Sequence, residues 1–310
     1  MTVDGTGAEA TPVEEISIGF VGLGNMGAVM SARLVAAGFT VHGHDISPPA
    51  RAALADAGGL AHDNLGDAVR DASLVILMLP NSDAVETVVR DPQFTLAAGT
   101  TVIDMGSSEP ARTQALAAEL GQREITLVDA PVSGGVAGAR AGRLTIMVGA
   151  DARTLDRIRP VFAPIGNPIL VGDVGAGHAV KALNNLLSAT HLLSTAEVMA
   201  AGQRFGLDPQ VMIDVFNSSS GQSRSTSSKW PDFVLPGTFN SGFALALMVK
   251  DMRIALGLAE QVGAADRLSR SSLEIWAAAA AALPPTADQT ELAAWVQRMG
   301  TLGDQGDLTS

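Results

Sequence analysis

A lysine and an asparagine four residues apart are the chain's strongest candidates for acid–base chemistry. Lys181 and Asn185 share one face if the stretch from Gly175 onward is helical. The neighbours of Lys181, from Ala179 to Leu187, are mostly apolar, which favours a buried lysine over a solvated one. Desolvation disfavours the charged amine, so such a lysine can act as general acid or base. Asn185 can donate and accept, which suits orienting a hydroxyl or a carboxylate.

Two further residues of this stretch bear on the same chemistry. His178, three residues before Lys181, is the rival acid–base residue, although as one of five histidines it fits a supporting or surface position better. Gly177 lies one turn before Lys181 and is expected to leave room for a substrate.

A second candidate site is the run Gly22-Leu23-Gly24-Asn25-Met26-Gly27. It follows an apolar stretch that predicts a buried strand, Ile16–Val21, and it precedes a predicted helix, Ala28–Ala37. Glycines in this context permit a tight turn, close approach of a pyrophosphate and close helix packing. The helix N-terminus then presents free N–H groups to the phosphates.

The acid that would bind the adenosine ribose is Asp45, about 20 residues after the glycines, as the dinucleotide-binding pattern requires. A carboxylate there repels a 2′-phosphate, so NAD is favoured over NADP. Arg51 follows six residues later and is the residue that could serve NADP instead.

A third candidate is the loop Asp129-Ala130-Pro131-Val132-Ser133-Gly134-Gly135. Exposed N–H groups beside the hydroxyl of Ser133 can hold a carboxylate. From composition alone, an ordinary turn before the next strand explains the loop equally well.

The elements that must position these residues alternate between strands and helices in the first half of the chain. The predicted strands after the first are Phe39–Asp45, Leu74–Pro80, Thr100–Asp104, Leu127–Ala130 and Leu144–Gly149. Such alternation predicts an α/β fold with a doubly wound, mostly parallel sheet of the Rossmann type. Ligands of these sheets bind beyond the carboxyl ends of the strands. Leu79, Pro80 and Ser107 are therefore expected on the same rim as the glycines.

The second half of the chain is predicted to be helical. Residues 175–205 show helical spacing without proline, and later helices are separated by breaks at 217–228, 231–242 and 283–285. The predicted organisation is a disordered tail over 1–15, a dinucleotide-binding domain over 16–173 and an all-helical substrate and dimerisation domain over 174–310. The apolar surplus of the long helix predicts a homodimer or homotetramer.

Composition excludes several classes of protein. The net charge of −12 argues against a nucleic-acid binder and against an anionic membrane surface. The chain has no cysteine and no tyrosine, which removes thiol chemistry and tyrosine as a catalytic acid. No run of 18 apolar residues and no basic N-terminal region occur, so a cytoplasmic protein is expected. The sequence shows no cluster of metal-ligating residues, so no metal site is expected.

Four motifs together resemble the β-hydroxyacid dehydrogenase family, which includes the 3-hydroxyisobutyrate dehydrogenases. They are Gly19–Gly27, Asp129–Gly135, Gly177–Asn185 and Met248-Val249-Lys250-Asp251, and they span most of the chain. The resemblance implies a Rossmann-type domain followed by a helical domain that interlocks subunits. It implies that Lys181 is the acid–base and that Asn185, Ser133, Gly134 and Gly135 hold the substrate. It also implies that Leu79, Pro80 and Ser107 line the NAD site and that Lys250 approaches the cofactor.

Two related groups differ from this chain. Imine reductases lack the lysine, and the longer phosphogluconate dehydrogenases have a His-Asn pair where this chain has Asn184-Asn185. By resemblance the segment Asn217–Arg224 lines the far side of the substrate, and its Gln222 and Arg224 match no substrate preference.

The function predicted is reversible hydride transfer between a small, 3-hydroxyisobutyrate-like 3-hydroxy acid and NAD. Two alternatives stay open. One is a reductase of the same family acting on tartronate or succinate semialdehyde, and the other is a non-catalytic dinucleotide-binding homologue.

Overall fold

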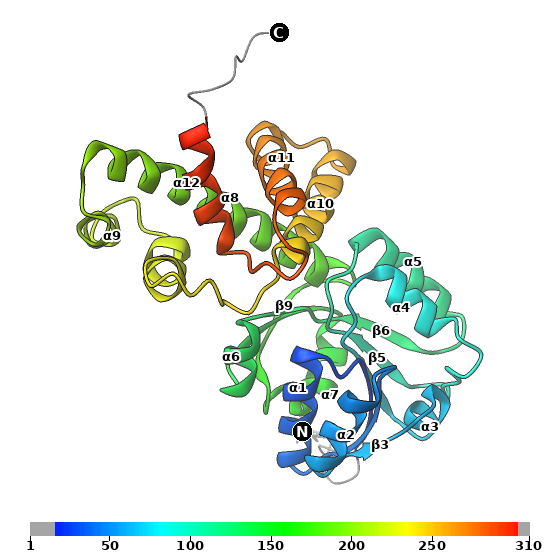
Figure 1. Ribbon diagram of the computed structural model, residues 1–310. Coiled ribbons are helices and arrows are strands. Elements are labelled where there is room, and N and C mark those ends of the chain that lie inside the picture. Colours follow the sequence, from blue (N-terminus) through cyan, green and yellow to red (C-terminus); the bar gives the residue numbers. More distant parts are fainter. Residues whose placement is uncertain (1–15, 303–310) are drawn as a thin grey trace, which may run out of the picture. The chain divides into compact units, whose positions relative to one another are not determined.

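A computed structural model describes residues 16–302, and the prediction of a disordered tail over residues 1–15 lies outside that range. The chain divides into two compact units, with the boundary between Lys181 and Ala182. We call them the sheet unit and the helical unit (Figure 1). The division falls a few residues beyond the predicted 173/174 limit, because the first residues of helix α8 (Ala176–Phe205) belong with the sheet. The domain limits proposed for function stay a prediction.

The sheet unit contains a nine-stranded sheet in the part of the chain that is described. Six strands run parallel in the order β3-β2-β1-β4-β5-β6, the strand order of dinucleotide-binding folds. Beyond β6, β8 is antiparallel, and it pairs with β7 and β9. The strands are β1 (Ser17–Val21), β2 (Thr40–His44), β3 (Leu60–Ala61), β4 (Leu74–Leu77), β5 (Thr101–Asp104), β6 (Thr126–Asp129), β7 (Val132–Ser133), β8 (Leu144–Gly149) and β9 (Gly166–Gly172). The predicted mostly parallel sheet is confirmed.

Helices cover both faces of this sheet because successive strand residues point to opposite sides. Ile76 packs into one core, while its neighbours Val75 and Leu77 pack into the other. The first core receives α1 (Asn25–Ala36), α2 (Pro48–Asp56), α6 (Gly135–Arg140) and α7 (Ala152–Phe162). The second receives α3 (Leu65–Val69), α4 (Ser82–Val89) and α5 (Pro110–Gly121). Each fully buried side chain of this size contributes about 1.5–3 kcal/mol.

The helical unit is built around the long helix α8. The other helices are α9 (Pro209–Asn217), η2 (Ser225–Val234), α10 (Leu245–Gln261), α11 (Arg267–Ala282) and α12 (Glu291–Leu302). Trp230 and Trp276 are fully buried in its core. Among the residues described, no helix combines the length and the apolar character needed to cross a bilayer.

One local prediction for this unit is wrong. Residues 225–234 were predicted to fall mainly within breaks, yet they form the wide helix η2 with Pro231 inside it. The serines and the proline resemble a loop in the sequence. Burial of Trp230 and the bond from Asn217 Nδ2 to the carbonyl of Thr226 stabilise a helical conformation there.

Candidate active site

The glycine loop between β1 and α1 has the geometry that a dinucleotide phosphate needs. Gly22 has a φ of +95°, and a Cβ at that position would collide with the carbonyl oxygen of Met78. A Cβ on Gly27 would collide with the carbonyl of Gly22. At Gly24, by contrast, a Cβ would meet no atom within 4 Å, so the space outside the loop stays open. No side chain caps the N-terminus of α1, which leaves its first N–H groups for an anion.

Asp45 fastens the tip of β2 to the glycine loop. Its Oδ2 accepts the N–H of Leu23 at 2.7 Å, and its Oδ1 accepts the N–H of Ser47 at 2.8 Å. A carboxylate offers about four lone-pair sites, so acceptor capacity for ribose hydroxyls remains. Arg51 is anchored beside it, with one nitrogen 2.7 Å from the Asp45 carbonyl oxygen and another 2.8 Å from Asp63 Oδ1.

The predicted rim residues follow the neighbouring parallel strands. Leu79 lies against the glycine loop, because a Cβ on Gly22 would be 3.1 Å from its Cδ2. A Cβ on Gly106 would collide with the Leu79 carbonyl, so the turn after β5 lies against the turn after β4. Ser107, in that turn, is half-buried, and Pro80 is exposed. The structure therefore brings Leu79 beside the glycine loop, and the turn that carries Ser107 beside Leu79.

The loop after β6 has a backbone that requires glycine. Gly134 has a φ of +128° and Gly135 a φ of +61°, in the region that other residues rarely adopt. Both glycines are exposed, and Ser133 beside them is half-buried. The carbonyl of Pro131 accepts the N–H of Met147 at 3.0 Å, which holds the loop to β8.

The start of α8 is fixed by Asp129, the last residue of β6. Its carboxylate accepts the N–H of Gly175 at 2.7 Å and the N–H of His178 at 2.8 Å. An anion at a helix N-terminus is stabilising. Burial raises the pKa of Asp129, and the charge of His178 and the two donated N–H groups partly oppose that rise.

Gly177 has a different role from the one predicted. A Cβ there would collide with the carbonyl of Met147 and would lie 2.8 Å from Asp129 Oδ2. The glycine therefore allows α8 to approach the sheet closely and does not leave room for a substrate. Lys181, one turn later, is only 8% exposed, as the apolar neighbours predicted.

His178 is buried, which excludes the surface position that the sequence left open. Its Nδ1 lies 2.9 Å from Thr113 Oγ1, and its Nε2 lies 3.6 Å from Asp104 Oδ2. It packs within the sheet unit.

Asn185 and Lys250 belong to the helical unit, where Asp251 joins them. Asn185 Nδ2 donates to Asp251 Oδ2 at 2.6 Å, and Lys250 Nζ lies 3.1 Å from Asp251 Oδ1. Asn185 is 6% exposed and Asp251 is 1% exposed, whereas the side chain of Lys250 is 25% exposed, so two buried side chains meet a half-buried lysine. The sequence places Asp251 in the motif that contains Lys250 but predicts no role for it.

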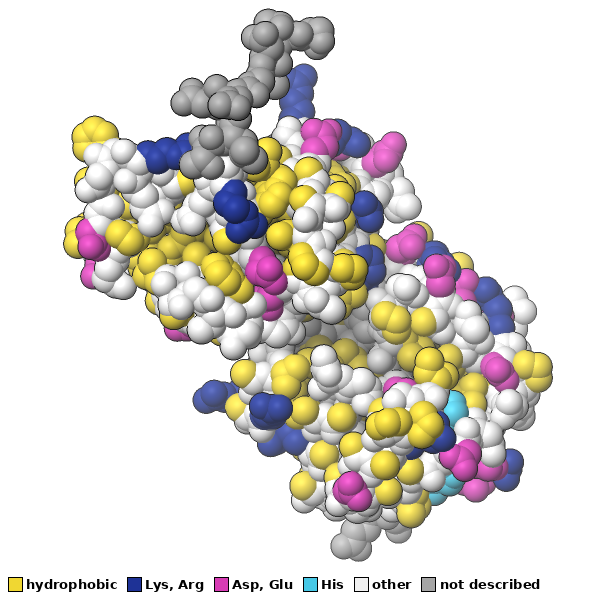
Figure 2. Space-filling model, viewed as in Figure 1, with side chains coloured by type: hydrophobic (Ala, Val, Ile, Leu, Met, Phe, Trp, Pro, Cys, Tyr) yellow, Lys and Arg dark blue, Asp and Glu magenta, His cyan; other side chains and the backbone are white. Residues whose placement is uncertain are grey.

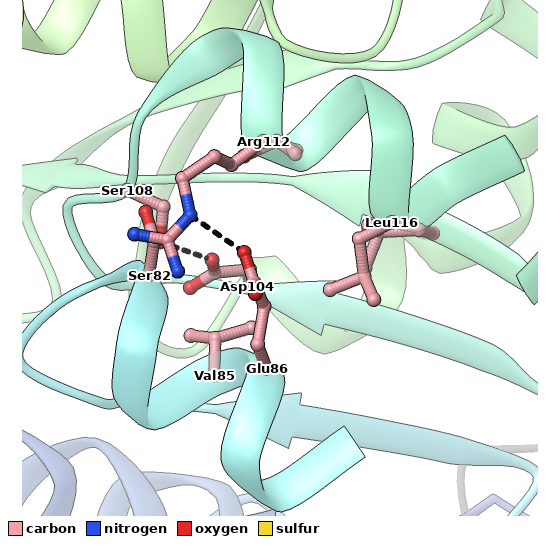
Figure 3. Close-up of a pocket in the computed structure, with 9 residues that line it drawn as sticks. Ser82, Val85, Glu86, Asp104, Ser108, Arg112 and Leu116 are labelled. Carbon is pink, nitrogen blue, oxygen red and sulfur yellow. Dashed lines mark hydrogen bonds and ion pairs between the residues drawn. The ribbon is translucent and has the colours of Figure 1, made fainter. Parts of the chain in front are cut away.

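A small polar cavity lies behind Asp104, between α4 and α5 (Figure 3). Ser108 donates to Asp104 Oδ2 at 2.7 Å, and Arg112 Nε donates to Glu86 Oε1 at 2.6 Å. This bond lowers the pKa of Glu86. The cavity measures about 10 Å³, which is space for one water at most and not for a substrate. In the part of the chain that is described, no group of three or more His, Asp or Glu side chains is arranged to hold a metal.

Two acids without a predicted role, Asp104 and Asp129, could have been identified from their positions at the ends of strands. Asp104 and Asp129 both end strands, β5 and β6, and they are register partners in the parallel ladder. Because carboxyl ends of parallel strands share one edge, two strand-ending acids predict a pair of carboxylates on the ligand-binding rim.

Two family models match the chain. Residues 17–175 match the NAD-binding domain of 6-phosphogluconate dehydrogenase. Residues 175–296 match the family model described as "NAD-binding of NADP-dependent 3-hydroxyisobutyrate dehydrogenase".

Three proteins illustrate the similarity. The chain is 41% identical to a 2-(hydroxymethyl)glutarate dehydrogenase of Eubacterium barkeri, over 78% of this chain and 82% of that protein. It is 38% identical to an NAD-dependent L-serine dehydrogenase of Pseudomonas aeruginosa, over 81% and 87% of the two chains. A structure of Mycobacterium tuberculosis 3-hydroxyisobutyrate dehydrogenase with L-serine has a TM-score of 0.84 at 34% identity, covering 91% of this chain and 99% of the other.

Proposed function

This chain belongs to the β-hydroxyacid dehydrogenase family, whose members oxidise a CH–OH group with a nicotinamide dinucleotide, and on that premise we propose that it acts on 2-substituted 3-hydroxypropanoates with NAD. The substrates named for three relatives are 2-(hydroxymethyl)glutarate, L-serine and 3-hydroxyisobutyrate. All three are carboxylates with a primary CH₂OH on the neighbouring carbon, and they differ in the substituent at C2. One set of catalytic residues can therefore serve the shared carboxylate and CH₂OH group, while the pocket around the C2 substituent decides between the acids.

The proposed chemistry assigns the proton to Lys181. As the neutral amine it takes the proton from the substrate hydroxyl while the C–O single bond becomes a carbonyl. A bound nicotinamide would supply the acceptor for the hydride that leaves the same carbon. Ser133 and the N–H groups near Gly134 and Gly135 hold the carboxylate, and Asn185 orients the hydroxyl. In the reverse direction, Lys181 returns the proton to the carbonyl oxygen.

The observation that supports this proposal most is the burial of Lys181 next to the fixed start of α8. A lysine that is 8% exposed loses much of the hydration that favours its charged form. Asp129 fixes the first turn of the same helix to the end of β6, the strand that precedes Ser133. A buried amine on a positioned helix is what a general base requires.

NAD is proposed over NADP because of the groups around Asp45. The carboxylate would repel a 2′-phosphate. Arg51, the residue that could neutralise that phosphate, already bonds to the Asp45 carbonyl and to Asp63. These two bonds engage both terminal nitrogens of its guanidinium. By resemblance, Leu79, Pro80, Ser107 and Lys250 complete the cofactor site.

A substrate panel tests the proposal. The acids are 3-hydroxyisobutyrate, L-serine, 2-(hydroxymethyl)glutarate and unsubstituted 3-hydroxypropanoate with NAD and with NADP. Succinate and tartronate semialdehydes with NADH form the reductive arm. Differences in pocket fit of about 1–3 kcal/mol should separate the acids by about 10–200-fold in kcat/KM. Preference for a semialdehyde without turnover of any acid would reverse the physiological assignment, and no turnover at all would favour the non-catalytic alternative.

A homodimer or homotetramer is proposed from the surface of the helical unit. Hydrophobic side chains lie on its surface in the region of α8 and α9 (Figure 2). The most exposed of the large ones on these helices are Leu187, Val198, Phe205, Val211 and Val215. Large exposed apolar surfaces commonly mark subunit interfaces. Light scattering should give at least twice the monomer mass of 31.7 kDa, and a monomer at micromolar concentration would contradict the proposal. The expected cytoplasmic location stays a prediction.

A further inference from the structure

A buried histidine lies between two buried carboxylates at the edge of the sheet. His178 Nε2 is 3.6 Å from Asp104 Oδ2, and His178 Nδ1 is 3.8 Å from Asp129 Oδ2. All three side chains are at most 1% exposed. The two acids come from adjacent parallel strands, where they are register partners. A fourth residue, Thr113 of α5, lies 2.9 Å from His178 Nδ1 through its hydroxyl.

Each carboxylate also holds the backbone of a segment with a proposed role in the reaction. Asp104 Oδ1 accepts the N–H of Gly106 at 2.9 Å, and Asp104 Oδ2 accepts the hydroxyl of Ser108 at 2.7 Å. These bonds shape the turn that contains Ser107, and Figure 3 shows Asp104 and Ser108 facing each other. Asp129 accepts the first N–H groups of α8 and precedes the loop of Ser133. His178 therefore lies where the cofactor turn, the substrate loop and the lysine helix meet.

Stability alone does not explain a histidine at this position. Its Nε2 is buried without a partner at hydrogen-bonding distance among the described residues. A buried polar atom in that state costs free energy, and replacing buried polar or ionic groups by apolar ones of similar volume is often neutral or stabilising. What the imidazole does supply is a fixed direction, because Thr113 of α5 bonds to its Nδ1 and the carboxylates at the ends of β5 and β6 lie within 4 Å of the ring.

We propose that His178 is a positioning residue for the reaction: it fixes the first turn of α8 against the ends of β5 and β6, and so fixes Lys181 one turn later. This rests on the proposed function, in which Lys181 moves the proton. The helix lies very close to the sheet at this point, since at Gly177 a Cβ would collide with the carbonyl of Met147. Misplacement of a reacting group by about 1 Å can cost about 10²-fold in rate.

The test compares His178→Leu with His178→Asn in the full-length enzyme. Leucine fills much of the volume without polar atoms, and asparagine keeps a polar group near the Nδ1 position that can bond to Thr113. We expect His178→Leu to lower kcat by about 10–100-fold, with KM and NAD Kd within about twofold of wild type. His178→Asn should recover part of kcat. The thermal unfolding midpoint of His178→Leu should stay close to that of wild type, so that loss of stability does not explain the lower kcat. His191→Asn, a histidine later on the same helix, is the matched control and should leave kcat unchanged.

A second measurement does not depend on turnover. The amides of Gly175 and His178 donate hydrogen bonds to Asp129. Their hydrogen exchange should accelerate in His178→Leu, while exchange in β4 stays unchanged. If the leucine variant does not fold, the same two measurements on His178→Asn decide the question. Wild-type kcat and wild-type exchange in the folded variant, or a loss that appears in NAD Kd, would overturn the proposal. A failure of the proposed function is separate, because it would appear as a Lys181→Met variant that retains its rate or as absence of turnover in wild type.

Discussion

Asn185 Nδ2 donates a 2.6 Å hydrogen bond to Asp251 Oδ2, and this bond joins α8 to α10 inside the helical unit. The same carboxylate lies 3.1 Å from Lys250 Nζ through its other oxygen. One buried acid therefore orients the two residues of this unit that have proposed roles in substrate and cofactor binding. Because the amide nitrogen of Asn185 faces Asp251, its oxygen is the acceptor of the side chain, and it already accepts Nδ2 of Asn184 at 3.2 Å.

Removing that acid should affect both stability and activity. Asp251→Ala leaves the buried amide of Asn185 without its acceptor, which costs about 1–3 kcal/mol of unfolding free energy. We also expect a higher NAD Kd, because Lys250 loses its ion pair with Asp251. Urea unfolding and NAD titration measure the two effects. Glu260→Gln, an exposed acid near the end of the same helix, is the control. Unchanged stability in Asp251→Ala would show that the bond contributes nothing.

Lys181→Met should remove the proton carrier while it keeps an unbranched side chain. General acid–base catalysis is typically worth about 10²–10⁴-fold, so the loss should appear in kcat. NAD affinity should change little, because the dinucleotide is expected on the glycine loop and Asp45. Lys181→Arg should rescue little, since arginine keeps its proton. Lys229→Met, whose lysine bonds to Ser188 and Gln289, controls for the loss of a lysine elsewhere. A near-native kcat in Lys181→Met would remove Lys181 from the mechanism.

The preference for NAD should depend on the carboxylate at the tip of β2. Asp45→Ser combined with Ile46→Arg removes the repulsion and supplies a cation for a 2′-phosphate. A hydrogen bond to a charged group is worth about 1.5–3 kcal/mol, so the NADP/NAD ratio of kcat/KM should rise by about 10–100-fold. Ile46→Arg alone is the control, because Ile46 is 93% exposed and its replacement should not disturb the fold. An unchanged ratio in the double variant would place cofactor choice elsewhere.

The stability of the protein should depend on pH through Asp129. Burial raises the folded-state pKa of this carboxyl above its unfolded value. The folded chain then holds the proton more tightly than the unfolded chain does. The stability that Asp129 contributes is therefore fully present below the unfolded pKa and is lost as pH rises through the folded pKa. We expect the unfolding free energy of wild type, measured with urea from pH 4 to 8, to fall relative to that of Asp129→Asn as pH rises. The opposite trend would mean that the donated N–H groups outweigh burial.

The sheet could be predicted because its signals are local. Apolar runs such as Leu74–Leu77 and the glycines at 22, 24 and 27 identify strands and a phosphate-binding turn within a few residues. Lys181 is buried as predicted, but its apolar neighbours Val180 and Leu183 are more than a third exposed, so its burial depends on which face of α8 packs and not on the local composition. What the sequence left open depends on packing between distant segments. The role of Gly177 requires the carbonyl of Met147, thirty residues earlier, and the wide helix around Trp230 requires a core to bury that side chain.

The supporting residues were the hardest to predict, for the same reason. Asp129 and His178 are separated by 49 residues, and Asn185 and Asp251 by 66. A single sequence shows acids at strand ends and within a helix, but only the fold shows which donor each acid faces.

The boundary between the two compact units has a practical consequence for dissecting the chain. It falls inside α8, a single 30-residue helix about 45 Å long, and not in a loop. Proteases cut exposed loops, such as residues 218–222, and a nick there divides the helical unit without releasing the sheet unit. A recombinant fragment that ends at Lys181 would keep only the first six residues of that helix. Isolated helices this short are marginal in water, so the lysine proposed to move the proton would stand at a frayed chain end.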